Sequence, residues 1–280
     1  MNTQEFIIAS LAEDIGSGDH STLASIDAKV VGTAKLIVKE AGIIAGIRIA
    51  KEVFLHLDKE AVFTAFHTDG EYLEVGTIAF TVKAKAQAIL QAERLVLNTM
   101  QRMSGIATLT HSYVEKIKNY STTILDTRKT TPLFRAFEKE AVLLGGAKNH
   151  RMGLYDMIML KDNHIDYCGG IEKAIVAVNN YLKELQLQLP IEVETRSLDD
   201  VKRVVKVGGV QRIMLDNFTP QEIEAALVLI NKQFETEASG GINFDTIEAY
   251  AATGVDFISV GAVIHHATSL DLSLKAVLHE

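Results

Sequence analysis

Hydrophobic and polar positions in the first part of the chain predict a mixture of helices and extended strands. Asn2 and Glu5 form a capping-box-like start before an apolar face, and Gly16 marks the end of this helix. Polar and apolar residues then roughly alternate over residues 28–38, as in a strand with one buried face. Further predicted elements are a helix over 47–57, strands over 61–66 and 77–82 with a hairpin-type turn at Asp69-Gly70 between them, and a helix over 86–117 interrupted near Ser104-Gly105. The pattern indicates a small α+β domain.

From about residue 120 the pattern changes to short apolar runs, rich in β-branched residues, that alternate with helical segments. Alternation of this kind is typical of βα units and a parallel sheet. Six candidate strands are too few for a regular eight-stranded barrel, which takes roughly 250 residues. The runs cover residues 122–125, 157–160, 191–193, 212–215, 234–238 and 257–260. A doubly wound open sheet and an incomplete α/β barrel both remain open.

Composition confines the chain to a globular class. Its 280 residues, 48% of them hydrophobic, can bury one large core or a large and a smaller one. No apolar run approaches the roughly twenty residues that cross a bilayer, and the N-terminus does not resemble a signal peptide, so we expect a cytoplasmic protein without a membrane partner. Cys168 is the only cysteine, which excludes a disulfide framework. A net charge of −8 without a basic stripe argues against nucleic acid as a partner.

One segment, residues 126–165, nevertheless concentrates basic residues in this acidic chain. The cations lie beside turn-forming residues rather than on one helical stripe, and binding residues concentrate in loops. We interpret the segment as several loops that converge on an anion. Its basic residues are Arg128, Lys129, Lys148, His150, Arg151, Lys161 and His164.

Polar or glycine-bearing sequences follow the candidate strands. In barrel enzymes the site lies at this face, and phosphate is commonly held by loops after the last strands. Because glycine lets backbone N–H groups approach phosphate, we predict a phosphate site at Ser239-Gly240-Gly241 and Gly261-Ala262. Glu194 and Asp216 suit Mg²⁺, which is usually bound through one or two carboxylates plus substrate phosphate oxygens. Glu192 projects to the same side of its strand as Glu194, so the choice between them stays open.

Longer ordered motifs run through the chain. They are Asp-Thr-Arg-Lys-Thr-Thr-Pro (126–132), Glu-Lys-Glu-Ala-Val (138–142), Gly-Gly-Ala-Lys-Asn-His-Arg-Met-Gly-Leu (145–154), Lys-Asp-Asn-His-Ile (161–165), Glu-Val-Glu (192–194), Met-Leu-Asp-Asn-Phe (214–218), Ser-Gly-Gly-Ile (239–242) and Thr-Gly-Val-Asp-Phe-Ile-Ser-Val-Gly-Ala (253–262). With these motifs, and over nearly its whole length, the chain resembles quinolinate phosphoribosyltransferase, which is nicotinate-nucleotide pyrophosphorylase (carboxylating). One departure is Leu133-Phe134-Arg135, where the family usually has Gly-Leu-Arg after Thr-Thr-Pro; it bears on the tightness of that turn.

The resemblance implies an N-terminal α/β sandwich domain over residues 1–105, which serves dimerisation, and an incomplete α/β barrel of about six parallel strands over residues 106–280. In this arrangement the C-terminal tail can pack back on the N-terminal domain. It also implies a homodimer or a hexamer, in which the N-terminal domain covers the partner's site. The implied reaction transfers the phosphoribosyl group of phosphoribosyl pyrophosphate to quinolinate with decarboxylation, giving nicotinate mononucleotide, pyrophosphate and CO₂ for NAD biosynthesis, with Mg²⁺ as cofactor.

Site roles are carried over by matching motif. The resemblance implies that Lys161, Glu194 and Asp216 are catalytic and that Glu194 and Asp216 also hold the metal. Phosphoribosyl pyrophosphate is assigned to Lys129, Ser239, Gly240, Gly241, Gly261 and Ala262. Quinolinate is assigned to Thr127, Arg128, His150, Arg151 and Lys161, with Arg94 reaching in from the partner subunit.

The residue types agree with this chemistry, because planar arginines can bind a dicarboxylate bidentately. For His150 we favour positioning over acid–base work, with a structural hydrogen-bonding role as the alternative. Two other functions stay open: that of a molybdenum-transport-associated protein of the same fold, and that of a phosphate-binding regulatory protein without turnover. Lys161 through His164 and the Thr-Thr-Pro motif argue against the first, and the retained carboxylates argue against the second.

Overall fold

The computed structural model describes residues 2–277, which fold into two compact units. Among these residues, the first unit consists of 2–111, 131–146 and 266–277, and the second of Ser112–Thr130 and Ala147–His265. The units therefore interleave along the chain. The simpler division at residue 105 stays a prediction.

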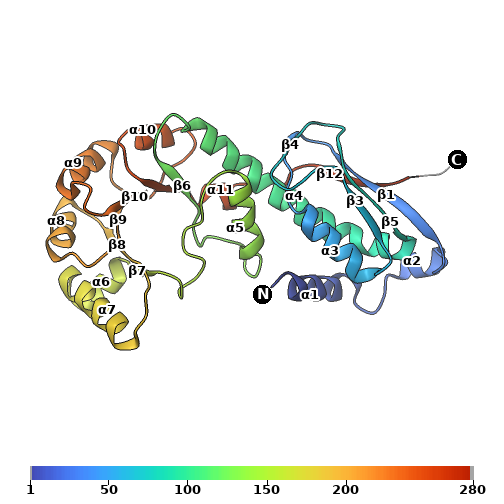
Figure 1. The fold of residues 1–280 in the computed structure, drawn as a ribbon, viewed down its shortest axis with the longest axis horizontal. Helices are drawn as coiled ribbons and strands as arrows, with labels where there is room; N and C mark the ends of the chain where they lie inside the picture. Colours follow the sequence, from blue (N-terminus) through green and yellow to red (C-terminus); the bar gives the residue numbers. More distant parts are fainter. Residues whose placement is uncertain (1, 278–280) are drawn as a thin grey trace. The chain divides into compact units, whose positions relative to one another are not determined.

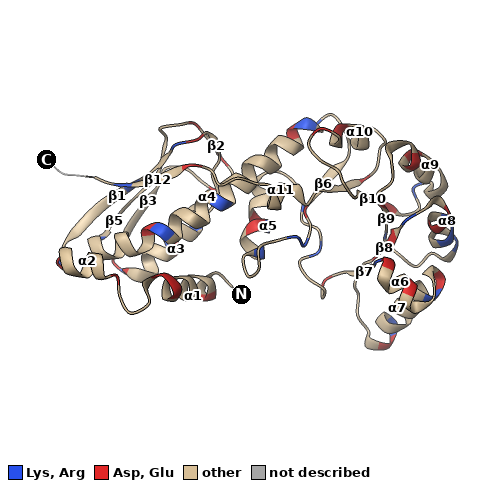
Figure 2. Cartoon of the chain, turned by 180° about the vertical axis from the view of Figure 1, so that it is seen from behind, with Lys and Arg blue, Asp and Glu red and all other residues tan. Residues whose placement is uncertain are grey.

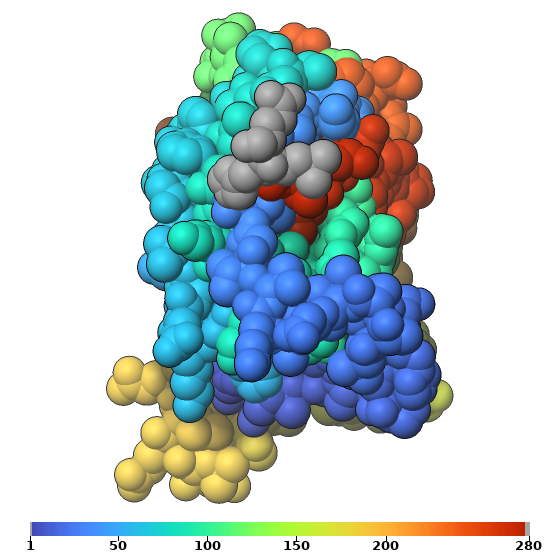
Figure 3. Space-filling view, turned by 90° about the vertical axis from the view of Figure 1, so that its right-hand side faces the viewer, coloured from blue at the N-terminus to red at the C-terminus, as the bar shows by residue number. Residues whose placement is uncertain are grey.

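The first unit is built on a four-stranded antiparallel sheet in the order β12-β1-β5-β3. Leu36 pairs with Leu274, so the last strand of the chain completes the sheet of the N-terminal residues. In Figure 3 the N-terminal residues of this unit are blue to cyan. Its strands are β1 (Val31–Val38), β3 (Val62–Ala65), β5 (Ile78–Lys85) and β12 (Leu272–Ala276), with a two-stranded sheet of β2 (Gly42–Ile43) and β4 (Tyr72–Leu73). Its helices are α1 (Thr3–Ile15), α2 (His20–Ser25), α3 (Ile47–Leu57), α5 (Arg135–Leu144) and most of α4 (Ala86–Lys116).

The predicted capping box at the start of α1 is confirmed. The side chain of Asn2 accepts from the N–H of Glu5, and the Glu5 carboxylate accepts from the N–H of Asn2. A turn is present at Asp69-Gly70, and the two predicted strands pair antiparallel as β3 and β5, but the connection is not a direct hairpin because β4 intervenes. Asp69 also accepts from the N–H groups of Ile47 and Arg48, and so caps α3 from a distant part of the chain.

The interruption predicted in the long helix is wrong, since α4 runs without a break from Ala86 to Lys116. Ser104 and Gly105 are instead the positions where two other segments pack against the helix. The Oγ of Ser104 accepts from the N–H of Ala45 at 2.9 Å, and a Cβ at Gly105 would overlap the carbonyl oxygen of Thr268. The small residues let two other segments approach the helix closely.

The second unit is a six-stranded parallel sheet in the order β6-β11-β10-β9-β8-β7, with α7 to α9 along its outer side (Figure 1). All six predicted strands are present. β6 and β7 follow each other in the chain yet form opposite edges of this sheet, as in a barrel left open at one seam, which confirms the predicted α/β fold class. The strands are β6 (Thr123–Leu125), β7 (Ile158–Leu160), β8 (Ile191–Thr195), β9 (Arg212–Asp216), β10 (Glu235–Ser239) and β11 (Phe257–Ser259). The helices are α6 (Asp162–Cys168), α7 (Ile171–Leu185), α8 (Leu198–Val207), α9 (Pro220–Ile230), α10 (Ile247–Ala251) and α11 (Ala262–His265).

The two faces of this sheet differ in polarity. Register pairs Glu192 with Arg212 and Arg212 with Glu235, so these charged residues lie on one face. Figure 2 shows the acidic positions on the neighbouring strands β8 to β10. Alternate positions, such as Val193 and Ile213, are fully buried and apolar. A polar inner face beneath the strand ends is therefore built into the strand register.

No helix among residues 2–277 is long and apolar enough to cross a bilayer.

Candidate functional site

The three residues predicted to be catalytic lie together at the C-terminal ends of neighbouring strands. Lys161 follows β7, Glu194 lies near the end of β8, and Asp216 ends β9. The Nζ of Lys161 is 3.2 Å from Oε2 of Glu194. Burial, and next the nearby negative charge of Glu194, raise the pKa of Asp216. Two carboxylates and one ammonium group thus share a small volume.

These carboxylates fit a divalent cation. Glu194 is largely buried and disfavours the charged form of Asp216, so a cation between them would relieve the repulsion. Their oxygen ligands are of the type that Mg²⁺ prefers. Glu192, the alternative ligand in the sequence, is fully buried and faces His150 instead.

The predicted phosphate loops follow the next strands in the sheet order. Ser239 ends β10, and its carbonyl oxygen accepts from the N–H of Asn217 at 2.8 Å. Gly240 has a φ of 93°, and a Cβ there would overlap the side chain of Asn217. A Cβ at Gly261 would lie 3.3 Å from Cδ of Lys129, so the Lys129 side chain runs beside the second loop. Ala262 begins α11 directly after it.

Two arginines predicted to bind quinolinate lie near each other in this unit. Burial, and next the positive charge of Arg128, lower the pKa of Arg151. Arg151 is 8% exposed, whereas Arg128 is exposed, and Nη1 of Arg151 donates to the carbonyl of Met157 at 3.3 Å. Thr127 is half-buried and accepts from the N–H of Lys129 at 3.0 Å. Two guanidinium groups near each other have the charge and geometry to bind one anion.

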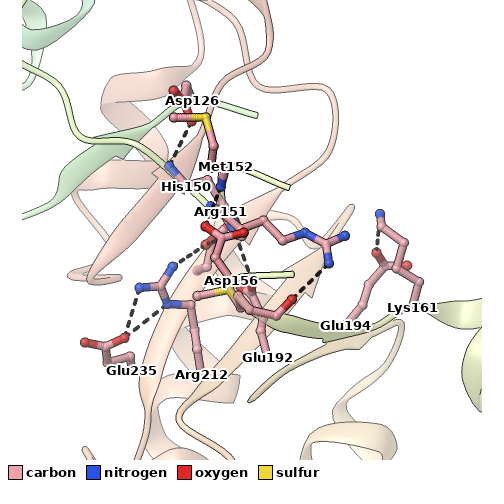
Figure 4. A network of polar contacts seen from close by, with 12 residues as sticks. Asp126, His150, Arg151, Met152, Asp156, Lys161, Glu192, Glu194, Arg212 and Glu235 are labelled. Carbon is pink, nitrogen blue, oxygen red and sulfur yellow. Dashed lines mark hydrogen bonds and ion pairs between the residues drawn. The ribbon is translucent and has the colours of Figure 1, made fainter. Parts of the chain in front are cut away.

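The segment that carries Arg151 is held at several points (Figure 4). Asp126, fully buried after β6, accepts from the N–H of His150 at 2.8 Å. Asp156 accepts from the N–H groups of Met152 and Gly153 at 2.6 and 2.8 Å. Hydrogen bonds on both sides of Arg151 therefore fix its backbone.

Below this segment lies a buried charged group that the sequence did not reveal. Nε2 of His150 is 2.9 Å from Oε2 of Glu192 and 3.3 Å from Oε2 of Glu237, and Nη1 of Arg212 is 2.9 Å from the same Glu237 oxygen. Both glutamates are fully buried. Burial lowers the pKa of His150, but Glu192 and Glu237 outweigh it and raise this pKa to about 9. The sequence does show charged residues within otherwise apolar strands, which could have indicated buried polar contacts. It could not show which of these residues contact each other, because that depends on the order of the strands in the sheet.

Two residues of the basic segment and one of α4 stand apart from this group. Nδ1 of His164 accepts from the N–H of Lys161 at 3.1 Å, and Lys148 pairs with Leu125 beside β6. Arg94 is exposed on α4 in the first unit. Its contribution to a partner's site stays a prediction.

Sequence comparison identifies relatives of both parts of the chain. The family description "Quinolinate phosphoribosyl transferase, N-terminal domain" matches residues 19–104, and the corresponding C-terminal domain description matches residues 106–275. A nicotinate-nucleotide pyrophosphorylase [carboxylating] of Oryza sativa subsp. japonica, described as chloroplastic, is 44% identical over 95% of this chain and 75% of its own length. A probable nicotinate-nucleotide pyrophosphorylase [carboxylating] of Synechocystis is 42% identical over 95% of this chain and 90% of its own length.

Solved structures agree in fold over nearly the whole chain. The nicotinate-nucleotide pyrophosphorylase from Francisella tularensis superposes with a TM-score of 0.92 at 38% identity, covering 98% of this chain and 96% of its own. NadC from Streptococcus pyogenes also gives a TM-score of 0.92, at 39% identity, covering 97% of this chain and 95% of its own.

Proposed function

Since this chain belongs to the quinolinate phosphoribosyltransferase family, we propose that it transfers the phosphoribosyl group of phosphoribosyl pyrophosphate to quinolinate with decarboxylation. The products are nicotinate mononucleotide, pyrophosphate and CO₂. The reaction belongs to NAD biosynthesis.

One observation carries this proposal beyond family membership. The second unit holds two arginines near each other, a carboxylate pair at the ends of two strands, and glycine loops after the neighbouring strands. A dicarboxylate and a pyrophosphorylated sugar together need this combination of fixed cations, a metal site and backbone donors. A simple anion-binding protein would gain nothing from Glu194 and Asp216.

The residues divide between the two substrates. Arg128 and Arg151 bind the quinolinate carboxylates, with Thr127, His150 and Lys161 in the same pocket. Lys129 and the loops Ser239–Gly241 and Gly261–Ala262 bind the phosphates. When bound by Glu194 and Asp216, Mg²⁺ supplies positive charge to the departing pyrophosphate.

No protein nucleophile is required. Pyrophosphate leaves C1 of the ribose with the bonding electrons, and the cationic sugar is stabilised by the carboxylates as the ring nitrogen of quinolinate forms the new bond. The nitrogen becomes positive. When the C2–carboxylate bond breaks, its electrons remain on the ring beside this nitrogen, CO₂ leaves, and a proton takes its place.

A direct assay tests the proposal. Purified protein is incubated with phosphoribosyl pyrophosphate, Mg²⁺ and quinolinate, or with nicotinate or nicotinamide in place of quinolinate, and nicotinate mononucleotide and CO₂ are followed. We expect product from quinolinate alone, and its loss when EDTA removes the metal. Turnover of nicotinate but not quinolinate would overturn the assignment.

The assembly and location are also part of the proposal. We infer a homo-oligomer, a dimer or a hexamer, in which Arg94 of one subunit completes the quinolinate pocket of another. Apolar side chains that are more than half exposed on the first unit offer surface for such contacts: Val31, Val62 and Tyr72 are 57%, 61% and 55% exposed. We further propose a cytoplasmic location, with neither nucleic acid nor membrane as partner.

A further inference from the structure

We propose that Glu192 and Glu237 are positioning residues of the quinolinate site: their carboxylates hold the Nε2 side of the His150 ring through short polar contacts and thereby fix the segment that carries Arg151. This inference rests on the proposed function. It gives a role to two buried carboxylates that are not assigned to phosphate binding or to the metal site.

Both ring nitrogens of His150 are engaged inside the protein. Nδ1 accepts from the backbone N–H of Arg151 at 2.7 Å, and Nε2 lies 2.9 Å from Glu192 and 3.3 Å from Glu237. A backbone N–H can only donate, so Nδ1 is an acceptor in this arrangement. The ring proton therefore lies on Nε2, between the two carboxylates, and the ring ties the Arg151 backbone to the sheet interior.

Charged side chains from three neighbouring strands surround the ring. Glu192 and Glu237 face the ring from β8 and β10, and Arg212 on β9 contacts Glu237 through Nη1 at 2.9 Å. Arg151 is close enough for the charge of Glu192 to favour its guanidinium form. Arg212 also pairs with Glu235 at 3.0 Å, so the two arginines face three carboxylates, and Glu192 and Glu237 raise the pKa of His150. An imidazolium would keep the Nε2 proton between these carboxylates but would place a second proton on Nδ1, against the N–H of Arg151. The neutral ring is therefore the form that ties the Arg151 backbone to the sheet interior.

Stability alone does not account for this group. Buried ion pairs are often replaced by apolar residues without loss of stability, because removing charges from water costs free energy. The fully buried Glu192 and Glu237 lie directly below the segment that presents the buried Arg151 to the anion site. Their placement is explained if the orientation of Arg151 matters for binding a carboxylate bidentately.

A metal ion is the competing interpretation of the same three side chains. His150, Glu192 and Glu237 each offer a ligand atom within 4.8 Å of the others. The Glu237 oxygen near the ring, however, also faces Arg212 at 2.9 Å. A cation placed there would meet a guanidinium group, which disfavours metal binding.

Kinetics of matched variants test the positioning role. In Glu192→Leu we expect the KM for quinolinate to rise about tenfold, as for loss of one charged hydrogen bond, while the KM for phosphoribosyl pyrophosphate stays within about twofold. Glu192→Gln keeps an acceptor for the Nε2–H and should restore the quinolinate KM to within about threefold. Thr195→Val is the control, because Thr195 is fully buried on the other face of β8, where its hydroxyl donates to the Met214 carbonyl. It should leave both KM values unchanged.

NMR of the His150 ring in the unsubstituted protein tests the proposal even if a variant fails to fold. In ¹⁵N-histidine-labelled protein, with His150→Asn used for assignment, Nε2 of His150 should carry a proton. A bare Nε2, or one Zn²⁺ or Mn²⁺ bound per chain and lost in Glu237→Gln, would overturn the proposal. Normal quinolinate turnover with an unchanged KM in Glu192→Leu would overturn the positioning role alone, whereas no turnover by the unsubstituted protein would overturn the proposed function.

Discussion

Leu133 has a backbone φ of 64°, in the left-handed region that a side chain disfavours. It stands where the resemblance places a glycine, and its side chain is 77% exposed, so little burial offsets the strain. The departure from the family pattern therefore puts a strained residue at this position of the turn. The two arginines that are predicted to bind one anion differ in exposure: Arg151 is buried and Arg128 is exposed.

Replacing Leu133 by glycine should stabilise the protein by about 0.5–1 kcal/mol, because relief of the left-handed strain exceeds the added entropy of the unfolded chain. Urea unfolding measures the change. Leu143→Gly is the matched control: Leu143 is 50% exposed but lies within α5, so glycine there should destabilise by about 1 kcal/mol. Equal destabilisation by both substitutions would contradict the strain argument.

Arg128→Ala should raise the KM for quinolinate about ten- to a hundredfold, since hydrogen bonds to charged groups are worth roughly 1.5–3 kcal/mol. Binding of phosphoribosyl pyrophosphate, measured by calorimetry, should be largely retained. Arg203→Ala removes a half-buried arginine on α8 that pairs with Glu172 and should leave the kinetics unchanged. Unaltered quinolinate kinetics in Arg128→Ala would remove this residue from the pocket.

At the scale of elements, the helix α4 shows how tertiary contact overrides local preference. A serine and a glycine in mid-helix suggested a break, because glycine is among the poorest helix formers. The helix continues because those small residues admit the segments at Ala45 and Thr268. In the same way, Asp69-Gly70 forms a turn but not a direct hairpin, and Asp69 also caps α3.

Helix propensity predicts that Gly105→Ala stabilises α4 by up to about 1 kcal/mol. The structure predicts the opposite, a loss of more than about 3 kcal/mol, because the new Cβ would overlap the carbonyl of Thr268. Thermal unfolding of this variant decides between them. Asn98→Ala, at an exposed position of the same helix, should change stability by no more than about 0.5 kcal/mol.

At the scale of the whole molecule, the quinolinate site is proposed to need a second subunit. Arg94 belongs to the first compact unit, whereas Arg128 and Arg151 belong to the second. In a symmetric dimer the same residue is exchanged in both directions, so each subunit would both donate and receive an arginine.

Mixing Arg94→Ala and Arg128→Ala subunits, assayed at a quinolinate concentration too low for either variant alone to turn over substrate, tests this exchange. Random reassembly into dimers should restore about a quarter of the native sites, because half of the dimers are hybrids and each hybrid has one intact site. Activity is measured after subunit exchange has been verified by mass spectrometry of differently tagged chains. Verified exchange without recovered activity would contradict a shared site.

Several features were determined by the sequence alone. The alternation of short apolar runs and helical segments predicted six parallel strands, and the parallel arrangement placed Lys161, Glu194 and Asp216 at the same edge of the sheet. Long ordered motifs also identified the family. Local chemistry and periodicity suffice here because strands in one parallel sheet present their carboxyl ends on the same side.

Only the tertiary structure distinguished the environments of Glu192 and Glu194. Glu192 and Glu194 lie on the same side of β8, so periodicity could not distinguish them. Depth in the barrel does, because Glu192 meets His150 in the interior while Glu194 meets Lys161 near the strand end. Glu237 and Arg212 lie close to His150 and Glu192 because β8, β9 and β10 are neighbours in the sheet. That order depends on packing between residues distant in the chain, which a local pattern does not record.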